Sequence, residues 1–368
     1  MHQTALCQAA GNWPLEERAQ VMEFIQAAPL EAKVRAGEML SDSATSHPNW
    51  GITWAVASLL PEEKVTLLKD INEMFQEVEV AEDGEELNLD FKTGPEKGDI
   101  MLKQLAQKLS PKLRVVQIAL ACNDDKFTDA GLSELAQRLS PKLASLQLKF
   151  GWNKSFTDSG LRELVKHISE NITSLQLDFG LNRNFGNAGL EDLAKKLSEN
   201  ITSLHLNFRS SEEFTDAGLI HLAENFPPTI TSLRLDFGKN EKFTDAGLKK
   251  LAQRLSPNLT CLQLDFCYNA EFADRALTVL AEKLPPKLKS LHLDFNVNKK
   301  FTDAGLKELA QGLSRELTSL ELTFRRNENF TDAALKYLAL NLPPQLVSCE
   351  LNFRRKKCEP RDLATLCA

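Results

Sequence analysis

Four residues on or near the predicted strands belong to types that could take part in nucleophilic, acid–base or metal chemistry: His205, His292, Cys261 and Cys267. A histidine beside a cysteine or serine can act as a general base, and both residue types bind metals. Their spacing fits no Ser/His/Asp or Cys/His arrangement, and the sequence has no GxxxxGKS or GxxxxGKT, no HExxH and no paired zinc-ligand pattern. The sequence therefore predicts a protein that is not an enzyme and has no cofactor or metal.

Three aspartates, Asp236, Asp265 and Asp294, follow one another at intervals of 29 residues. If such a spacing places them side by side, their carboxylates repel one another unless something compensates. Calcium sites usually gather about 6–8 oxygens, so we favour a structural role, with local hydrogen bonds and counter-charges from Arg234 and His292. A site for a cation or a basic partner is the alternative.

The interval of 29 residues runs through most of the chain. It is marked by a phenylalanine before each helical segment, at Phe127, Phe156, Phe185, Phe214, Phe243, Phe272, Phe301 and Phe330. A fixed period between about 20 and 50 residues is typical of a solenoid of stacked repeats. We therefore expect the chemistry-bearing residues above to be arranged in columns across an array.

Each repeat contains a segment in which apolar residues alternate with polar ones, the pattern of a strand with one buried face. The ten segments begin at Leu87, Val116, Leu146, Leu175, Leu204, Leu233, Leu262, Leu291, Leu320 and Cys349. A Thr-Asp-Ala-Gly-Leu motif then predicts a helix capped by the threonine. We expect the glycine of this motif to allow close contact between neighbouring helices, and Ser-Pro or Pro-Pro to end each helix.

One strand and one helix in each repeat predict an α/β solenoid. The strands form a parallel sheet, and the helices cover one side of it. Because the strand spacing of about 4.8 Å is smaller than a helix diameter of about 10 Å, the array should curve into a horseshoe with the sheet on the concave face.

The repeats resemble the leucine-rich repeats of the ribonuclease-inhibitor type, through Leu143-x-x-Leu146-x-Leu148 and the helix signature Phe-Thr-Asp-Ala-Gly-Leu. The resemblance covers about residues 85–355 and implies a protein-binding array. One feature differs. The family's asparagine or cysteine normally lies three residues after the second strand leucine, whereas Asn153 and Asn269, for example, lie five residues after it. This predicts a longer loop that departs from the usual asparagine ladder, similar to divergent arrays of single-celled eukaryotes.

Exposed residues that interrupt a recurring column are the best candidates for partner contacts, because the fold does not require them. Aromatic and arginine residues are common anchors of protein interfaces. The predicted partner-binding residues are Trp152, His205, Arg209, Arg234, Tyr268, His292, Arg325 and Arg326.

Residues 1–84 form a predicted acidic helical head, in which Pro61 begins an amphipathic helix. Residues 1–90 hold 17 Asp and Glu against 5 Lys and Arg, a net charge of −12. We interpret the head as a cap for the first repeat, because an array must cover its exposed ends. A docking element that includes Leu59-Leu-Pro-Glu-Glu63 is the alternative. Residues 356–368 are the predicted C-terminal cap or tail.

Composition narrows the possible partners and compartments. The net charge of −7 is unfavourable for a dedicated nucleic-acid binder, and no apolar run is long enough to span a membrane. Seven scattered cysteines without a CxxC pattern predict a reduced, intracellular and cytoplasmic protein. Cys358 and Cys367 are either a free pair or a bridge in the C-terminal cap.

The sequence thus predicts a non-catalytic interaction or scaffold protein, either a monomer or a subunit of an assembly. It would bind a protein through the concave face and the asparagine-bearing rim loops. One alternative is an adaptor, similar to those of ubiquitin ligases, in which the head docks a machine and the array selects a substrate. A structural subunit of a larger assembly is the other.

Overall fold

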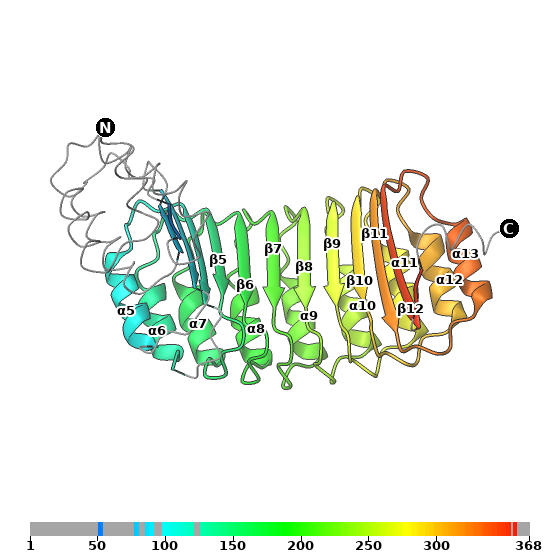
Figure 1. Cartoon of the computed structure of the whole chain (residues 1–368), viewed down its shortest axis with the longest axis horizontal. Helices are drawn as coiled ribbons and strands as arrows, with labels where there is room; N and C mark the ends of the chain where they lie inside the picture. Colours follow the sequence, from blue (N-terminus) through cyan, green and yellow to red (C-terminus); the bar gives the residue numbers. More distant parts are fainter. Residues whose placement is uncertain are drawn as a thin grey trace, which may run out of the picture. The chain divides into compact units, whose positions relative to one another are not determined.

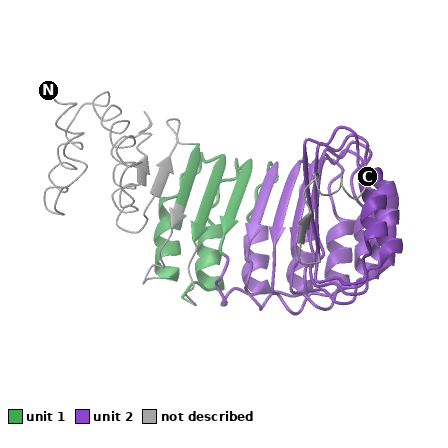
Figure 2. Ribbon diagram, turned by 45° about the vertical axis from the view of Figure 1, so that its right-hand side comes forward, with its two compact units in different colours: residues 1–150, 167–171 green, residues 151–166, 172–368 purple. Residues whose placement is uncertain are grey.

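The computed structural model describes residues 51–53, 77–80, 85–91, 98–120, 126–354 and 356–358 of the 368-residue chain. The helices predicted for 16–40 and 61–75 lie outside these residues. The chain divides into two compact units (Figure 2): unit 1 contains residues 1–150 and 167–171, and unit 2 contains residues 151–166 and 172–368. In each unit the helices lie on one side of the strands (Figure 1).

Unit 1 combines predicted repeats with two short strands from the N-terminal region. Its elements are β1 (Gly51–Thr53), β2 (Glu77–Val80), β3 (Glu86–Phe91), α5 (Asp99–Lys108), β4 (Val115–Leu120), α6 (Asp129–Ala136) and β5 (Ser145–Lys149). Strands β3, β4 and β5 are parallel neighbours, β2 pairs antiparallel with β3, and β1 pairs parallel with β2. The sequence pattern did not predict β1 or β2, which are too short to show a clear alternation.

Unit 2 contains the remaining repeats. It begins with α7 (Asp158–Lys166), β6 (Ser174–Asp178), α8 (Asn187–Ala194), β7 (Ser203–Asn207), α9 (Asp216–Glu224), β8 (Ser232–Asp236) and α10 (Asp245–Gln253). It continues with β9 (Cys261–Asp265), α11 (Asp274–Lys283), β10 (Ser290–Asp294), α12 (Asp303–Gly312), β11 (Ser319–Arg325), α13 (Asp332–Leu340), β12 (Ser348–Arg354) and β13 (Lys356–Cys358). Strands β6 to β12 lie in sequence order, and β13 returns antiparallel to β12.

The strands are aligned so that equivalent residues of successive repeats lie opposite one another. Leu262 of β9, for example, lies between Leu233 of β8 and Leu291 of β10. These leucines face the helices and are buried, whereas Gln263 and Asp265 on the other side are partly exposed. The predicted ten-strand pattern, β3 to β12, is confirmed.

Phenylalanines form the centre of the core. Phe266 stacks between Phe237 and Phe295, with ring centroids 6.0 and 6.2 Å away. Phe272, from the start of the following helical segment, meets the edge of Phe266 at 5.4 Å. The phenylalanine that marks the 29-residue period is therefore one half of an aromatic ladder that joins each repeat to the next.

The Thr-Asp pair at the start of the helices has two functions. The Thr244 hydroxyl accepts a hydrogen bond from the Ala246 N–H at 3.2 Å, which confirms the predicted cap. The Thr244 N–H also donates to the Asp216 carboxylate of the preceding repeat, at 2.9 Å. Asp274 accepts the same bond from the Thr302 N–H at 2.7 Å. The aspartate at the helix start therefore fastens its repeat to the next one.

This contact explains the glycine of the motif. A Cβ added at Gly247 would lie 2.3 Å from the Asp216 carboxylate, so the glycine leaves room for the fastening side chain. By contrast, proline does not explain where the helices end. Helix α12 ends without a following proline, and there the Ser314 hydroxyl donates to the Pro286 carbonyl at 2.7 Å. The prediction that proline stops each helix is wrong, because a serine without a following proline also marks the end of a helix.

The asparagines form a ladder despite their unusual position. Asn269 is fully buried, and its Nδ2 donates to the carbonyls of Phe266 and Phe237 at 3.0 and 3.4 Å. Asn240 bonds in the same way to Phe237 and to Phe208, at 2.9 and 3.2 Å. The loop is longer than in the usual repeat, but its asparagine still points inward. The predicted asparagine-bearing rim is thus corrected, because these side chains are not at the surface.

Candidate functional site

The open face is the side of the strands that faces away from the helices. On β9 it carries Cys261, Gln263 and Asp265, all partly exposed, and equivalent residues recur on each strand. All eight predicted contact residues belong to unit 2, on or next to this face. The structure leaves Trp152, Arg234, Tyr268, Arg325 and Arg326 exposed, whereas His205, Arg209 and His292 are partly buried.

The predicted contacts fall into separate columns. His205, Arg234 and His292 occupy the middle position of β7, β8 and β10, and His205 lies directly opposite Arg234. His292 is held by Glu321 of β11, with 2.7 Å between Nδ1 and Oε2. Sequence reasoning did not identify this partner. The signal was available, because glutamate occupies the position 29 residues after His292.

A second column, the rim row, lies just beyond the carboxyl ends of the strands. Its members share a backbone φ between 61° and 71°, in the left-handed region. They are Trp152, Leu181, Ser210, Lys239, Tyr268, Val297 and Arg326. Trp152 is 57% exposed and Tyr268 is 37% exposed. The Lys239 ammonium lies 5.8 Å from the centre of the Tyr268 ring, a cation–π contact.

The aspartate row, Asp236, Asp265 and Asp294, lies at the carboxyl ends of adjacent strands, where its members face one another in register. Each carboxylate accepts a hydrogen bond from the backbone N–H two residues later. The distances are 3.0 Å for Asp236, 2.9 Å for Asp265 and 2.8 Å for Asp294. These bonds shape the turn that leaves each strand, which agrees with the structural role favoured from the sequence.

The counter-charge for this row comes from Arg209 rather than from Arg234. The Arg209 guanidinium comes from the loop after β7 and passes Gly238, and its Nη1 lies 3.0 Å from Asp265 and 3.9 Å from Asp236. A Cβ at Gly238 would lie 3.0 Å from this nitrogen. Arg234 points out of the strand between two buried leucines and is exposed. Sequence columns alone do not show that a side chain can span two strands.

Burial changes the protonation of the outer aspartates. Desolvation, together with the charge of Asp265, raises the pKa of Asp236 to about 7. The same two causes raise the pKa of Asp294 to about 6. Arg209 opposes both shifts. Asp236 and Asp294 can therefore gain or lose protons near neutral pH.

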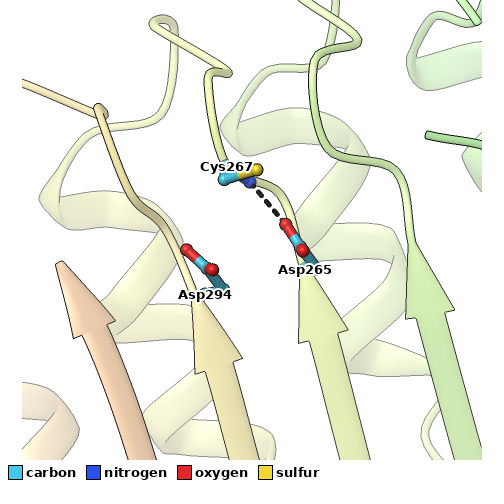
Figure 3. Close-up of side chains that lie close together, drawn as sticks. All are labelled: Asp265, Cys267 and Asp294. Atoms are coloured by element: carbon cyan, nitrogen blue, oxygen red, sulfur yellow. Dashed lines mark hydrogen bonds between the residues drawn. The ribbon is translucent and has the colours of Figure 1, made fainter. Parts of the chain in front are cut away.

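Cys267 completes a small cluster with Asp265 and Asp294 (Figure 3), in which the sulfur and carboxylate oxygens lie within 4.8 Å of one another. Oxygen and sulfur ligands at this spacing could meet a metal ion. However, Cys267 is 98% buried, since only 2% of it is exposed. Burial first, and then the charge of Asp265, raise the pKa of its thiol. A protonated thiol is a poor ligand and nucleophile, and Arg209 already binds Asp265. The cluster fits a structural ion-pair site better than a metal site.

Comparison with known proteins supports the assignment of the repeats. A family model described as leucine-rich repeat matches residues 229–252. No curated protein matches the chain significantly. Among solved structures, the leucine-rich repeat-containing protein LegL7 from Legionella pneumophila aligns with a TM-score of 0.45 and 18% identity, over 73% of this chain and 84% of LegL7.

Two further solved structures align more weakly. A chain of the Rad7 and Elc1 complex from yeast gives a TM-score of 0.41 and 17% identity, over 92% of this chain and 98% of that one. A chain of the Toll–Spatzle complex of Drosophila gives 0.37 and 14%, over 68% and 31%. The three scores are too low to add to an assignment that rests on the repeats themselves.

The 29-residue period, the pairing of one strand with one helix and the family match over residues 229–252 show an α/β solenoid of leucine-rich repeats. No helix among the described residues is both long and apolar enough to cross a membrane.

Proposed function

We propose that this protein is a non-catalytic recognition module that binds a protein partner through the open face and the rim row of unit 2. One observation carries the proposal. The recurring asparagines and strand-end aspartates bond within the array, whereas Trp152 and Tyr268 interrupt the columns and remain exposed. Exposed aromatic and arginine side chains on a rigid sheet are the residue types that anchor protein interfaces.

The open face suits this role better than the helical face. Neighbouring strands are held in fixed register by backbone hydrogen bonds, so the side chains above them keep constant spacing. The middle strand position varies from Gln176 through His205 and Arg234 to Glu321, although the buried positions beside it stay leucine. Variation of this kind on a constant scaffold gives specificity without loss of stability.

The test compares one charge reversal on each face of the same repeat. Arg234→Glu changes the open face, and Lys250→Glu changes an exposed residue on α10. The full chain is first used to select partners from a protein array, and the affinity of each variant for those partners is then measured. We expect Arg234→Glu to weaken binding at least ten-fold and Lys250→Glu to leave it unchanged. The reverse pattern would contradict the proposal.

The adaptor alternative to a simple recognition module depends on residues 1–84, which we propose to be a separate head. The residues of its docking segment, Leu59 to Glu63, lie outside the described part of the chain. Paired substitution of Leu59 and Leu60 by alanine in the full chain separates the alternatives. An adaptor would lose one partner and keep another, whereas a simple recognition module would keep all of them.

A further inference from the structure

The rim row has an unusual backbone. All seven residues adopt the left-handed conformation, with φ between 61° and 71°, and none is glycine. A residue with a side chain loses roughly 1–2 kcal/mol in this region, whereas glycine adopts it freely. Glycine does occur next to the row, since three of its members directly follow a glycine, at Gly151, Gly180 and Gly238.

The conformation is imposed by hydrogen bonds between repeats rather than by the side chains. The Trp152 N–H donates to the Gly180 carbonyl at 2.8 Å, and the Tyr268 N–H donates to the Asn296 carbonyl at 2.7 Å. The pattern continues along the row to Val297, whose N–H donates to the Arg325 carbonyl at 2.9 Å. A glycine would make the same bonds with less strain. The side chains of the row are thus not needed for the backbone that carries them, and strain of this kind points to a function.

The row is apolar and positively charged. Trp152 and Leu181 are neighbours at one end, and Tyr268 and Val297 are neighbours further along. Lys239 lies beside Tyr268, and Arg326 follows Val297. The loop charges just beyond the row neutralise one another instead, as in the Lys242–Glu213 pair at 2.9 Å and the Lys300–Glu271 pair at 2.7 Å.

We propose that the rim row binds an extended segment of a partner protein in which apolar residues alternate with acidic ones. The proposal rests on the protein-binding function above and specifies the chemistry of its partner. Apolar side chains of the segment would contact Trp152 and Tyr268, and acidic side chains would face Lys239 and Arg326. Net negative charge on the segment complements the two cations of the row.

The repeat spacing gives the segment a length. Adjacent strands are about 4.8 Å apart and an extended chain advances about 3.3 Å per residue. Trp152 and Tyr268 are four repeats apart, or about 19 Å, which corresponds to about six residues. Arg326 lies two repeats further, or about three residues. The segment is therefore about ten residues long, with two apolar anchors about six residues apart, an acidic residue between them and another after the second.

The first test measures the binding of labelled ten-residue peptides to the full chain by fluorescence anisotropy. One peptide has the predicted pattern with leucine anchors and glutamates, a second has lysines in place of the glutamates, and a third has glutamines. Oligouridine of similar length is the nucleic-acid probe. We expect the glutamate peptide to bind at least ten-fold more tightly than the others. Equal or tighter binding of the lysine peptide or the RNA would overturn the proposal, as would failure of the glutamate peptide to bind.

The second test uses glycine to remove side chains without disturbing the backbone. Trp152→Gly and Tyr268→Gly should each reduce peptide affinity at least ten-fold and leave the thermal unfolding midpoint unchanged or higher. Ser210→Gly is the matched control: Ser210 has the same backbone but is 7% exposed, so its side chain is not among the proposed contacts with the segment. It should bind the peptide normally. If the two glycine variants bind as tightly as the native protein, the rim row is not the site.

Measuring the binding of a natural partner distinguishes failure of this proposal from failure of the proposed function. If Arg234→Glu abolishes binding of that partner and the double variant Trp152→Gly, Tyr268→Gly does not, the open face recognises the partner and the rim proposal fails alone. If neither change affects it, both proposals fail.

Discussion

The aspartates of the open face have two separate effects: they shape the turn after each strand, and they add negative charge to the row. Asp236 shapes its turn by accepting the Gly238 N–H at 3.0 Å, and it adds to a crowded row of carboxylates. The turn requires only an acceptor oxygen. At the equivalent position of the preceding repeat, Asn207 accepts the Arg209 N–H at the same distance of 3.0 Å without a charge. The negative charge of Asp236 is therefore dispensable for the fold.

This predicts that Asp236→Asn stabilises unit 2 at high pH. The pKa of Asp236 is about 7 in the folded protein and about 3.9 in an unfolded chain. Because the folded pKa is the higher one, this residue favours folding below about pH 4 and loses that contribution as pH rises through 7. We expect the variant to be more stable than the native protein by about 1–3 kcal/mol at pH 8 and equal to it at pH 4. Urea denaturation at the two pH values measures the difference.

The reciprocal change, Asn207→Asp, is the control. It adds a carboxylate next to Asp236 and should lower the free energy of unfolding at pH 8 more than at pH 4. An equal effect of either substitution at both pH values would contradict the assigned protonation.

The buried asparagines predict a different response. Asn269→Ala removes two hydrogen bonds, to the carbonyls of Phe237 and Phe266, and leaves both acceptors buried. We expect the free energy of unfolding to fall by about 1–3 kcal/mol. Glu271→Ala, which breaks the exposed pair with Lys300, should cost less than about 1 kcal/mol. Denaturation of both variants under identical conditions tests the contrast, and equal losses would contradict a buried ladder.

At the residue scale, the columns of the sequence predicted which residues lie side by side but not how far their side chains extend. They placed the aspartates side by side, yet they assigned the counter-charge to Arg234 and His292, which lie two residues before Asp236 and Asp294. Arg209 supplies it because Gly238 leaves a path across β8. The columns did not predict that Cys267 is buried, with only 2% of it exposed. A repeat period does not show in which direction a side chain points or whether it extends past the neighbouring repeat.

At the scale of the helix and strand, periodicity was enough for most of the fold. Alternating leucines predicted β3 to β12, and the threonine caps predicted most helix starts, as Thr215 and Thr302 confirm. The short strands β1 and β2 were missed. The ends of the helices were attributed to proline, whereas Ser314 makes the turn without one. Strong repetition therefore predicts what recurs in every repeat and misses what occurs once.

Two glycines of the helices predict unequal effects when replaced. A Cβ at Gly312 would lie 2.4 Å from the Ala281 carbonyl oxygen, which is backbone and cannot rotate away. We expect Gly312→Ala to destabilise unit 2 by about 1–3 kcal/mol. At Gly247 the obstacle is the end of the Asp216 side chain, and alanine already occupies the equivalent positions Ala276 and Ala334. Gly247→Ala should therefore cost less. Chemical denaturation ranks the two, and a larger loss for Gly247→Ala would contradict this packing.

At the scale of the molecule, unit 2 is a stack in which each repeat contacts its neighbours. Its stability should then be a sum of local terms rather than a property of a single centre. The ladder of stacked phenylalanines is the most continuous of these connections.

This predicts that damage to the core spreads only locally. Phe266→Ala removes a fully buried ring and should cost about 3–5 kcal/mol. In native-state hydrogen exchange, amides of β8, β9 and β10 should lose the most protection, and those of β6 should lose the least. Uniform loss of protection across unit 2 would show that the stack unfolds as one cooperative body instead.

The hydrogen bond from each helix start to the next repeat also gives the array a direction. Asp303 accepts from the Thr331 N–H, 28 residues later, at 2.8 Å. A duplicated repeat inserted between α10 and α11 would therefore form this hydrogen bond with the repeat before it and with the repeat after it.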